Sequence, residues 1–404
     1  MGKEYNSYIL NTVYESSSNV AKFLSSEMSR QDKNIELIAS ENYPSDAVMA
    51  AAGSIFCAKY TEGYPADKTI GNKGRYYGSC ENYDKLELYG IEVFQKLFNT
   101  KNYYFNLQPH SGSSANCIAY STVLDVGDTV LAMDMNSGAH LTHSSSASFV
   151  SKLYDVHTYG IDENGNLNYD DILNIAKVVK PKLIVCGASA YPKIIYFKKF
   201  KEIADAVGAY LMADISHIST LCAKGLHPTP FGYCDLITFT TQKIFRGNRG
   251  GVVACTLNLA KKLDSACFPR WQGGALQNMV AAKVIAAEEA CTEKYNDYVR
   301  QVVKNAKAMR DEFAKMGYDV SDTDTHMFFI DFSKTHPNLT GKMIQDELDK
   351  HHITVNKNCV PNEKRSPMQA SGIRIGTPAM TTRGFVEKDF VNVAHKIDEI
   401  IKAM

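Results

Sequence analysis

The sequence predicts an α/β fold, with a large domain built on a mainly parallel sheet covered by helices and a smaller C-terminal α+β domain. Between Asn42 and Thr256, short apolar runs alternate with helical segments, which is typical of parallel strands buried on both faces. After Gly274 this alternation gives way to a long helical stretch rich in Ala, Glu and Lys. The length of 404 residues also exceeds what one hydrophobic core usually fills, so two domains are expected.

The first predicted element is an N-terminal helical arm. It is expected over Ser7–Met28, where the apolar residues are too loosely spaced for a full core-facing stripe. Such an arm is expected to pack on a partner subunit. In the large domain we predict four strands, the first two separated by an amphipathic stretch at 200–207. These strands are Leu183–Ala188, Tyr210–Ile215, Leu236–Thr240 and Gly251–Thr256.

The C-terminal part begins with a long helix over Asn278–Phe313, which we expect to bridge the two domains. A strand, a helix and two further strand segments follow before a terminal helix, at His326–Phe332, Thr340–Lys350, Ile353–Val355 and Gly372–Gly376. This second domain has a usual size for one. We therefore divide the chain into an arm (1–41), a large domain (42–276) and an interdomain helix with a small domain (277–404).

Composition argues against several classes of protein. Lys+Arg and Asp+Glu both number 44, so the net charge is zero, whereas a nucleic-acid-binding protein normally carries a basic surplus. No apolar run approaches the roughly 18–20 residues that span a bilayer, and the polar N-terminus shows no signal peptide. The ten cysteines are scattered without a C-x-x-C pair, which is typical of free thiols in a reducing compartment. We expect a cytoplasmic protein that binds neither nucleic acid nor membranes.

The stretch from Leu211 to Gly251 carries the most informative residues. Lys243 follows an apolar strand among hydroxyls and glycines, where an amine can form a Schiff base with an aldehyde cofactor. Asp214 ends a neighbouring strand, where a carboxylate can keep a pyridine nitrogen protonated, and ligands of open α/β sheets bind at this edge. Each residue alone is weak evidence, because such a lysine is usually a solvated surface residue and such an aspartate usually a cap.

A phosphate site and a ring contact are the next requirements of such chemistry. The Ser/Gly loop His110–Asn116 opens onto a helical run at Cys117–Leu124 and is a candidate anion site, with an ordinary helix N-cap as the alternative. His140 is the candidate imidazole beside the cofactor ring. His140 and His143 also have helix-face spacing, but no third ligand lies beside them in the sequence, so no metal site is expected.

Longer strings extend over nearly the whole chain, and with them the sequence resembles the serine hydroxymethyltransferase family, pyridoxal-phosphate enzymes of fold type I. The strings are Glu36–Asn42, Tyr60–Pro65, Arg75–Gly78, Gln108–Ser113, Asn356–Asn358, Val360–Asn362 and Ser371–Pro378. The resemblance implies a seven-stranded, mainly parallel sheet in the large domain. It also implies that serine and glycine are interconverted by retro-aldol cleavage of the Cα–Cβ bond, with tetrahydrofolate as co-substrate.

For the cofactor, the resemblance implies pyridoxal 5'-phosphate bound covalently to Lys243, with Asp214 at its pyridine nitrogen and His140 stacked on its ring. The other contacts that it implies are Ser189 and His217 near the ring hydroxyl, Ser111, Gly112 and Ser113 at the phosphate, and Gly273 and Gly274 at the phosphate of the neighbouring subunit.

For the substrate, Arg374 matches the arginine that holds the amino-acid carboxylate, a task for which a bidentate guanidinium is suited, and Ser40 matches a further contact. Glu62 matches the acid/base carboxylate, and Tyr60 and Tyr77 match the two tyrosines of the site. The residues expected to touch folate are Leu141, Tyr76, Asn358 and, across the dimer interface, Phe268. The shared site implies a homodimer, and the sequence leaves open whether dimers pair into tetramers.

The sequence departs from the family around the folate pocket and the acid/base loop. The departures are Gln242, where the family has His before the lysine, Ser137 and Ala139 in place of a histidine and a glycine, Arg270 and Trp271 near the subunit interface, and an apparent insertion at Ala66–Asn72. Two alternatives therefore stay open. One is a folate-independent aldolase or transaldolase for threonine-type β-hydroxy amino acids, and the other is an inactive paralogue that serves as a binding subunit.

Overall fold

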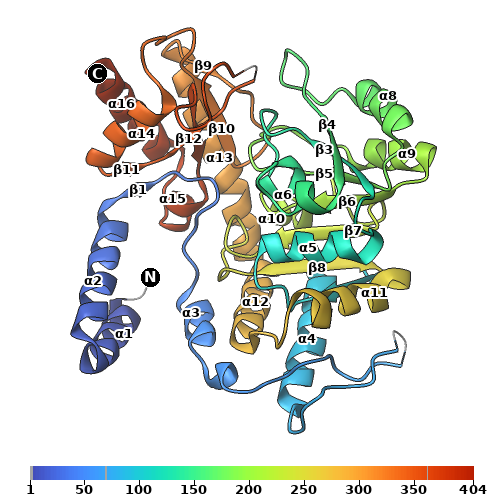
Figure 1. Cartoon of the computed structure of the whole chain (residues 1–404). Helices are drawn as coiled ribbons and strands as arrows, with labels where there is room; N and C mark the ends of the chain where they lie inside the picture. Colours follow the sequence, from blue (N-terminus) through green and yellow to red (C-terminus); the bar gives the residue numbers. More distant parts are fainter. Residues whose placement is uncertain (1–2, 69–70, 362) are drawn as a thin grey trace.

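The computed structural model describes residues 3–68, 71–361 and 363–404, and its larger sheet lies beside a smaller one (Figure 1). In the described chain the larger sheet has seven strands in the order β2-β8-β7-β6-β5-β3-β4. They are β2 (Tyr103–Asn106), β3 (Thr129–Met133), β4 (Asp155–Tyr159), β5 (Leu183–Cys186), β6 (Tyr210–Asp214), β7 (Leu236–Thr240) and β8 (Gly251–Thr256). Only β8 runs antiparallel to its neighbours, so the predicted sheet is confirmed.

Helices cover both faces of this sheet, because successive residues of a strand point to opposite sides. On β5, Ile184 and Cys186 enter one core while Leu183 and Val185 enter the other. The first core is closed by α4 (Glu81–Leu97), α8 (Tyr169–Val179), α9 (Phe197–Val207) and α12 (Gln277–Ala290), and the second by α5 (Gly112–Val123), α7 (Val150–Leu153) and α11 (Ala260–Ser265). Burial on both faces explains why these strands are continuous apolar runs.

The C-terminal part is built on a four-stranded antiparallel sheet in the order β12-β13-β10-β9. Its strands are β9 (Asp319–Val320), β10 (Met327–Asp331), β12 (Asn356–Asn358) and β13 (Gly372–Gly376). Helices α14 (Gly341–Lys350) and α16 (Glu387–Lys402) complete its core. A parallel pair of short strands, β1 (Ile35–Glu36) and β11 (Ile353–Thr354), attaches the N-terminal segment to this part.

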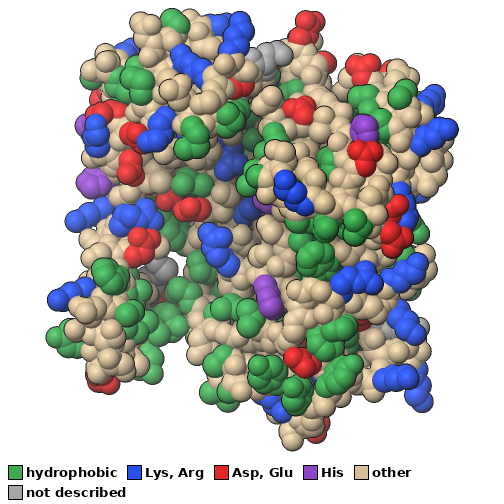
Figure 2. Space-filling view, in the orientation of Figure 1, with side chains coloured by type: hydrophobic (Ala, Val, Ile, Leu, Met, Phe, Trp, Pro, Cys, Tyr) green, Lys and Arg blue, Asp and Glu red, His purple; other side chains and the backbone are tan. Residues whose placement is uncertain are grey.

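Two predicted helices are each divided by a capping hydroxyl. The arm consists of α1 (Lys3–Ser16) and α2 (Ser18–Lys33), because Ser17 accepts a hydrogen bond from the backbone of Val20 and begins a new helix. The stretch expected as one helix over Asn278–Phe313 is α12 and α13 (Glu293–Lys315), because Thr292 caps α13 in the same way. Aromatic and aliphatic side chains are exposed on the arm helices (Figure 2).

Helix α13 contributes to two cores. Its first half packs below the large sheet through Tyr295, Val299 and Val302, and Met309 and Phe313 pack in the small core. The other α-helices of the described residues are α3 (Asp46–Ala52), α6 (Leu141–Ser144), α10 (Ser219–Ala223) and α15 (Pro378–Thr382). No described helix is both long and apolar enough to cross a membrane. The domain limits at 41 and 276 stay a prediction.

Candidate active site

Five loops that follow strands of the large sheet bring their side chains to one edge. β2 is antiparallel to β8, which is itself antiparallel to β7, so β2 runs in the same direction as the parallel strands. The carboxyl ends of all six therefore lie together. Ser111 follows β2, His140 follows β3, Ser189 follows β5, Asp214 ends β6 and Lys243 follows β7. This edge is where open α/β sheets bind ligands.

Lys243 is buried, with 8% of its surface exposed. Its backbone carbonyl accepts a hydrogen bond of 3.0 Å from the side chain of Asn42, which ties the turn after β7 to the N-terminal segment. Within the described chain, its amino group makes no hydrogen bond or ion pair. Burial lowers the pKa of Lys243 to about 8, a shift that the charge of Asp214 opposes and the charge of Arg374 favours. A fraction of this amine is therefore unprotonated near neutral pH, the form that attacks a carbonyl.

Asp214 is held by hydrogen bonds to both carboxylate oxygens. Its Oδ2 accepts from Asn116 at 2.9 Å and from Nε2 of His143 at 3.0 Å, and its Oδ1 accepts from the backbone of Ser216 at 3.0 Å. Burial by itself raises the pKa of Asp214, but the hydrogen bond and charge of His143 outweigh it and hold that pKa below its usual range. Asp214 is thus a buried carboxylate that stays ionised.

The tautomer of His143 follows from its neighbours. Its Nδ1 accepts from the backbone N–H of His140 at 3.3 Å, so in the neutral ring the proton is on Nε2, which faces Asp214. Burial lowers the pKa of His140 to about 4, and its Nδ1 accepts from the backbone of Thr142. His140 is therefore a neutral ring next to a charged carboxylate.

The structure corrects one step of the reasoning about metals. The sequence offered no third ligand beside His140 and His143, but the fold brings Asp214 close, and the candidate ligand atoms of the three residues lie within 4.8 Å of one another. The hydrogen bond between His143 and Asp214 accounts for part of this clustering.

Arg374 lies on β13 of the small sheet and points toward the same edge. Its Nη1 donates to the carbonyl of Ser189 at 2.7 Å and its Nε to the side chain of Asn356 at 3.1 Å. The side chain is 8% exposed, and in the described chain it has no acidic partner. Burial lowers the pKa of Arg374 to about 10. Because an unpaired buried charge is costly, this guanidinium is suited to an anionic ligand.

Two further contacts place the N-terminal segment and β6 beside Arg374. Gly376 on β13 lies so close to Ala39 that a Cβ added to the glycine would be 2.3 Å from the Cα of Ala39. Ser40, the next residue, is therefore close to β13. Nδ1 of His217 lies 3.2 Å from Nε2 of His326, the residue that precedes β10. Burial lowers the pKa of both imidazoles.

The loop expected to bind phosphate precedes α5. The hydroxyl of Ser111 accepts from the backbone of Ser114 and begins the helix, while Gly112 and Ser113 form its first turn. The loop lies tightly against β8, because a Cβ on Gly251 would come within 2.2 Å of the Ser111 carbonyl oxygen. Ser111 and Ser113 are exposed, as an anion site at a helix N-terminus requires.

A second group of predicted residues lies together around Glu62. A Cβ on Gly273 would be 3.7 Å from Oε1 of Glu62, and one on Gly274 would be 3.5 Å from the Tyr60 ring. The rings of Tyr60 and Tyr77 have centroids 5.6 Å apart. In the described chain no hydrogen bond or ion pair joins these residues to Lys243.

The predicted folate residues divide between the same two groups. Asn358 lines a cavity of about 280 Å³ together with Ser189 and Arg374, and Leu141 directly follows His140 in the first group. Tyr76 and Phe268 belong to the second group, with ring centroids 5.6 Å apart.

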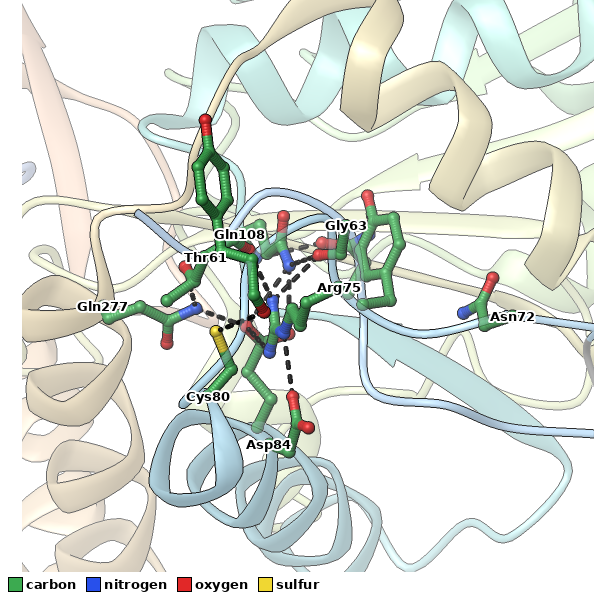
Figure 3. Close-up of polar contacts among 12 residues, drawn as sticks. Thr61, Gly63, Asn72, Arg75, Cys80, Asp84, Gln108 and Gln277 are labelled. Atoms are coloured by element: carbon green, nitrogen blue, oxygen red, sulfur yellow. Dashed lines mark hydrogen bonds and ion pairs between the residues drawn. The ribbon is translucent and has the colours of Figure 1, made fainter. Parts of the chain in front are cut away.

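Arg75 fixes the loop that carries Glu62 (Figure 3). Its Nη1 donates at 2.8 Å to the carbonyls of both Thr61 and Gly63. The same guanidinium contacts Glu87 and Asp84, each at 2.8 Å. Sequence reasoning used Arg75 only as part of a string, and missed its contacts because they join residues of the Glu62 loop and α4.

Four of the substituted positions have clear contacts. Gln242 accepts from the backbone of Gly250 at 3.4 Å, and Ser137 donates to Asp134. Trp271 donates from its ring N–H to the hydroxyl of Ser121 on α5. Arg270 donates to the carbonyl of the same residue at 2.6 Å. In the insertion Ala66–Asn72, residues 69–70 lie outside the described chain, and Asn72 donates to the buried carboxylate of Asp264 at 2.7 Å.

The residues at the sheet edge fit an aldehyde-bearing, phosphorylated pyridine. A buried amine without a partner fits the aldehyde, an ionised buried carboxylate fits a protonated ring nitrogen, and a Ser/Gly helix N-terminus fits a phosphate. Buried polar atoms that still lack a partner, among them Oγ1 of Thr240 and Nδ1 of His326, also indicate room for a ligand.

Comparison with known proteins gives one consistent result. A family model described as Serine hydroxymethyltransferase matches residues 13–397. A serine hydroxymethyltransferase from Francisella tularensis subsp. novicida (strain U112) is 47% identical over 379 residues, which cover 93% of this chain and 88% of that protein.

Proposed function

The chain belongs to the serine hydroxymethyltransferase family, and we propose that the residues at the carboxyl edge of the large sheet carry the family's reaction. That reaction interconverts serine and glycine, with pyridoxal phosphate as cofactor and tetrahydrofolate as co-substrate. The similarity to known proteins favours this activity over a folate-independent aldolase or an inactive paralogue.

One observation carries the assignment of residues: Lys243 and Arg374 are both buried, and neither has an acidic partner at ion-pair distance in the described chain. Burying two cations without partners is costly. This cost is removed when the Lys243 amine bonds to an aldehyde carbon and the Arg374 guanidinium binds an α-carboxylate. Pyridoxal phosphate presents the aldehyde, and an α-amino acid presents the carboxylate, that this pair requires.

When bound, pyridoxal phosphate supplies an electron sink for the Cα of the amino acid. Asp214 would face the ring nitrogen and keep its proton in place, since His143 and Asn116 hold the carboxylate ionised. His140, neutral and half-buried, would cover the ring. Ser111, Gly112 and Ser113 would bind the phosphate, and Ser189 and His217 would lie near the ring hydroxyl.

The carboxylate and the hydroxyl of the substrate need separate contacts. Arg374 would bind the carboxylate with Ser40 beside it, because the N–H groups of a guanidinium match two oxygens. Glu62 would move the proton of the substrate hydroxyl, with Tyr60 and Tyr77 adjacent. Leu141, Tyr76, Asn358 and Phe268 would contact the folate.

The separation of the two groups supports a homodimer with shared sites. Glu62, Tyr60, Gly273 and Gly274 are close to one another, and among the described residues no hydrogen bond or ion pair joins them to Lys243. In a two-fold dimer a contact of one residue with a different residue of the partner occurs twice, once in each direction, so the Glu62 group of each subunit would complete the Lys243 group of the other. Exposed aromatic residues of this group, Tyr60 and Tyr76, fit an interface.

The test is glycine formation by the purified protein from serine, with pyridoxal phosphate present and tetrahydrofolate added or omitted. We expect turnover that requires tetrahydrofolate, and none in Lys243→Ala, which also loses the absorbance of the bound aldehyde. Equal turnover without folate, or with threonine in preference to serine, would contradict the proposal. All ten cysteines are free, which supports the proposal of a reducing, cytoplasmic location.

A further inference from the structure

Lys283, on α12, is a buried cation that the reaction does not use. Its side chain is 1% exposed. Nζ donates to the carbonyl oxygens of Leu107 at 2.7 Å, Pro109 at 2.8 Å and Gly251 at 2.9 Å. No carboxylate of the described residues lies within ion-pair distance of it. Three carbonyl acceptors match the three N–H donors of an ammonium group, whereas a neutral amine offers only two.

The carbonyls of Leu107 and Pro109 belong to the loop that leads from β2 into the phosphate-binding turn, and Gly251 begins β8. Lys283 binds the carbonyls of Leu107 and Pro109. Gln272 donates to the carbonyl between them, that of Gln108, at 3.0 Å, and accepts from the N–H of His110 at 3.0 Å. Two side chains thus determine the course of the backbone directly before Ser111.

The space around Lys283 is matched to its side chain. A Cβ on Gly250 would lie 2.3 Å from Cε of Lys283, so the glycine leaves room for the lysine stem. The ionisable groups that act on the ammonium or feel its charge are Cys267, Glu87 and His110, and burial lowers the pKa of Lys283 to about 7. The geometry favours the charged form, because only the ammonium supplies one N–H donor to each of the three carbonyls.

We propose that Lys283 is a positioning residue for the cofactor phosphate. Its ammonium holds the Leu107–His110 loop in the shape from which Ser111, Gly112 and Ser113 meet the phosphate, and it places a positive charge behind that loop. The inference rests on the proposed function, since it takes the Ser111 turn as the phosphate site.

The test compares two aldehydes that differ only in the phosphate. Pyridoxal phosphate and pyridoxal are titrated into the cofactor-free full-length chain, and their binding at Lys243 is followed by absorbance. In Lys283→Met we expect pyridoxal phosphate to bind about 10- to 100-fold more weakly, as for the loss of one charge-assisted contact. Pyridoxal should bind within about twofold of wild type. Equal losses for both aldehydes, or no loss for either, would overturn the proposal.

Two controls keep the result interpretable. Lys262→Met removes an exposed lysine of α11 and should change neither affinity. Gly250→Ala displaces the Lys283 stem without removing a charge, and should shift the ratio of the two affinities in the same direction. This variant replaces Lys283→Met as the deciding test if Lys283→Met does not fold by circular dichroism. A wild-type chain that binds neither aldehyde would contradict the proposed function itself, whereas normal wild-type binding with an unchanged ratio in the variants contradicts only the role of Lys283.

Discussion

Arg75 and Glu87 form a buried ion pair at 2.8 Å, with side chains 2% and 5% exposed. The same guanidinium binds the carbonyls on both sides of Glu62 (Figure 3). Glu87 in turn accepts from the side chains of Gln108 and Gln277. The position of the proposed acid/base residue is therefore set by an arginine that does not itself take part in proton transfer.

Arg75→Lys tests this relationship. Lysine keeps the charge opposite Glu87 but cannot reproduce the fork that reaches four acceptors. We expect kcat to fall by about a hundredfold, as for a catalytic group displaced by roughly 1 Å. Binding of pyridoxal phosphate at Lys243 should be unchanged. Arg310→Lys, a matched change in an arginine with solvent-exposed acidic partners, should leave both quantities unchanged, and a parallel loss of cofactor binding in Arg75→Lys would contradict the assignment.

His143→Ala tests the control of the Asp214 charge. The pKa of Asp214 is lowered in the folded chain, so its contribution to stability is present above the ordinary aspartate pKa of about 3.9 and is lost as pH falls through the folded value. Without His143, the charges of His140 and Lys243 still lower that pKa, but the effect of burial is less opposed and the folded pKa rises relative to wild type. In urea unfolding between pH 7 and pH 3, the variant should therefore begin to lose stability at a higher pH than wild type. Parallel curves would show that His143 does not hold the charge.

Asp264 anchors the insertion through Asn72, and burial raises the pKa of Asp264 to about 7, against the hydrogen bonds of Asn72, Asn106 and Tyr104. A carboxyl group with a raised folded pKa binds its proton more tightly in the folded chain. The contribution of the protonated Asp264 side chain to the stability of the folded chain is therefore lost as pH rises from about 4 to 7. Glu87, which also faces it, favours the neutral form.

Asp264→Asn removes this titration. Relative to wild type, the free energy of unfolding of the variant should increase from pH 4 to pH 7, by at most about 1.4 kcal/mol per pH unit. Chemical unfolding of both proteins at several pH values measures the difference. A difference that stays constant over this range would contradict a raised pKa at Asp264.

The sequence predicted the large sheet well because burial on both faces leaves a simple signal. The runs ending at Asp214 and Thr240 are uninterrupted apolar strands, and their observed bounds differ from the predicted ones by at most a residue or two. The helix over Asn278–Phe313 was predicted too long, because the helical residues on both sides of Thr292 conceal a cap that only the hydrogen bond to Tyr295 reveals.

In the candidate active site, the sequence predicted some residues and missed the contacts between others. Residues that follow strands, such as Lys243 and Asp214, can be placed at one edge by topology alone. The clustering of Asp214 with His143, and of Lys283 with the carbonyls of Leu107 and Pro109, joins residues far apart in the chain, and no spacing rule predicts such contacts. A shared site was implied only by resemblance, through Gly273, Gly274 and Phe268, and the side of the interface on which Glu62 acts was not predicted, because sequence carries no record of which subunit completes a site.

The most direct test of this account mixes two inactive variants, Lys243→Ala and Glu62→Gln. A dimer of one chain of each kind has one site with both substitutions and one intact site, if Glu62 acts in the partner's site. Random re-association of equal amounts should then restore about a quarter of the wild-type activity. Serine cleavage with tetrahydrofolate would be measured after the subunits are dissociated and mixed. No recovery, with mixed dimers confirmed by two affinity tags, would contradict the account, because it would place Glu62 and Lys243 in the same subunit's site.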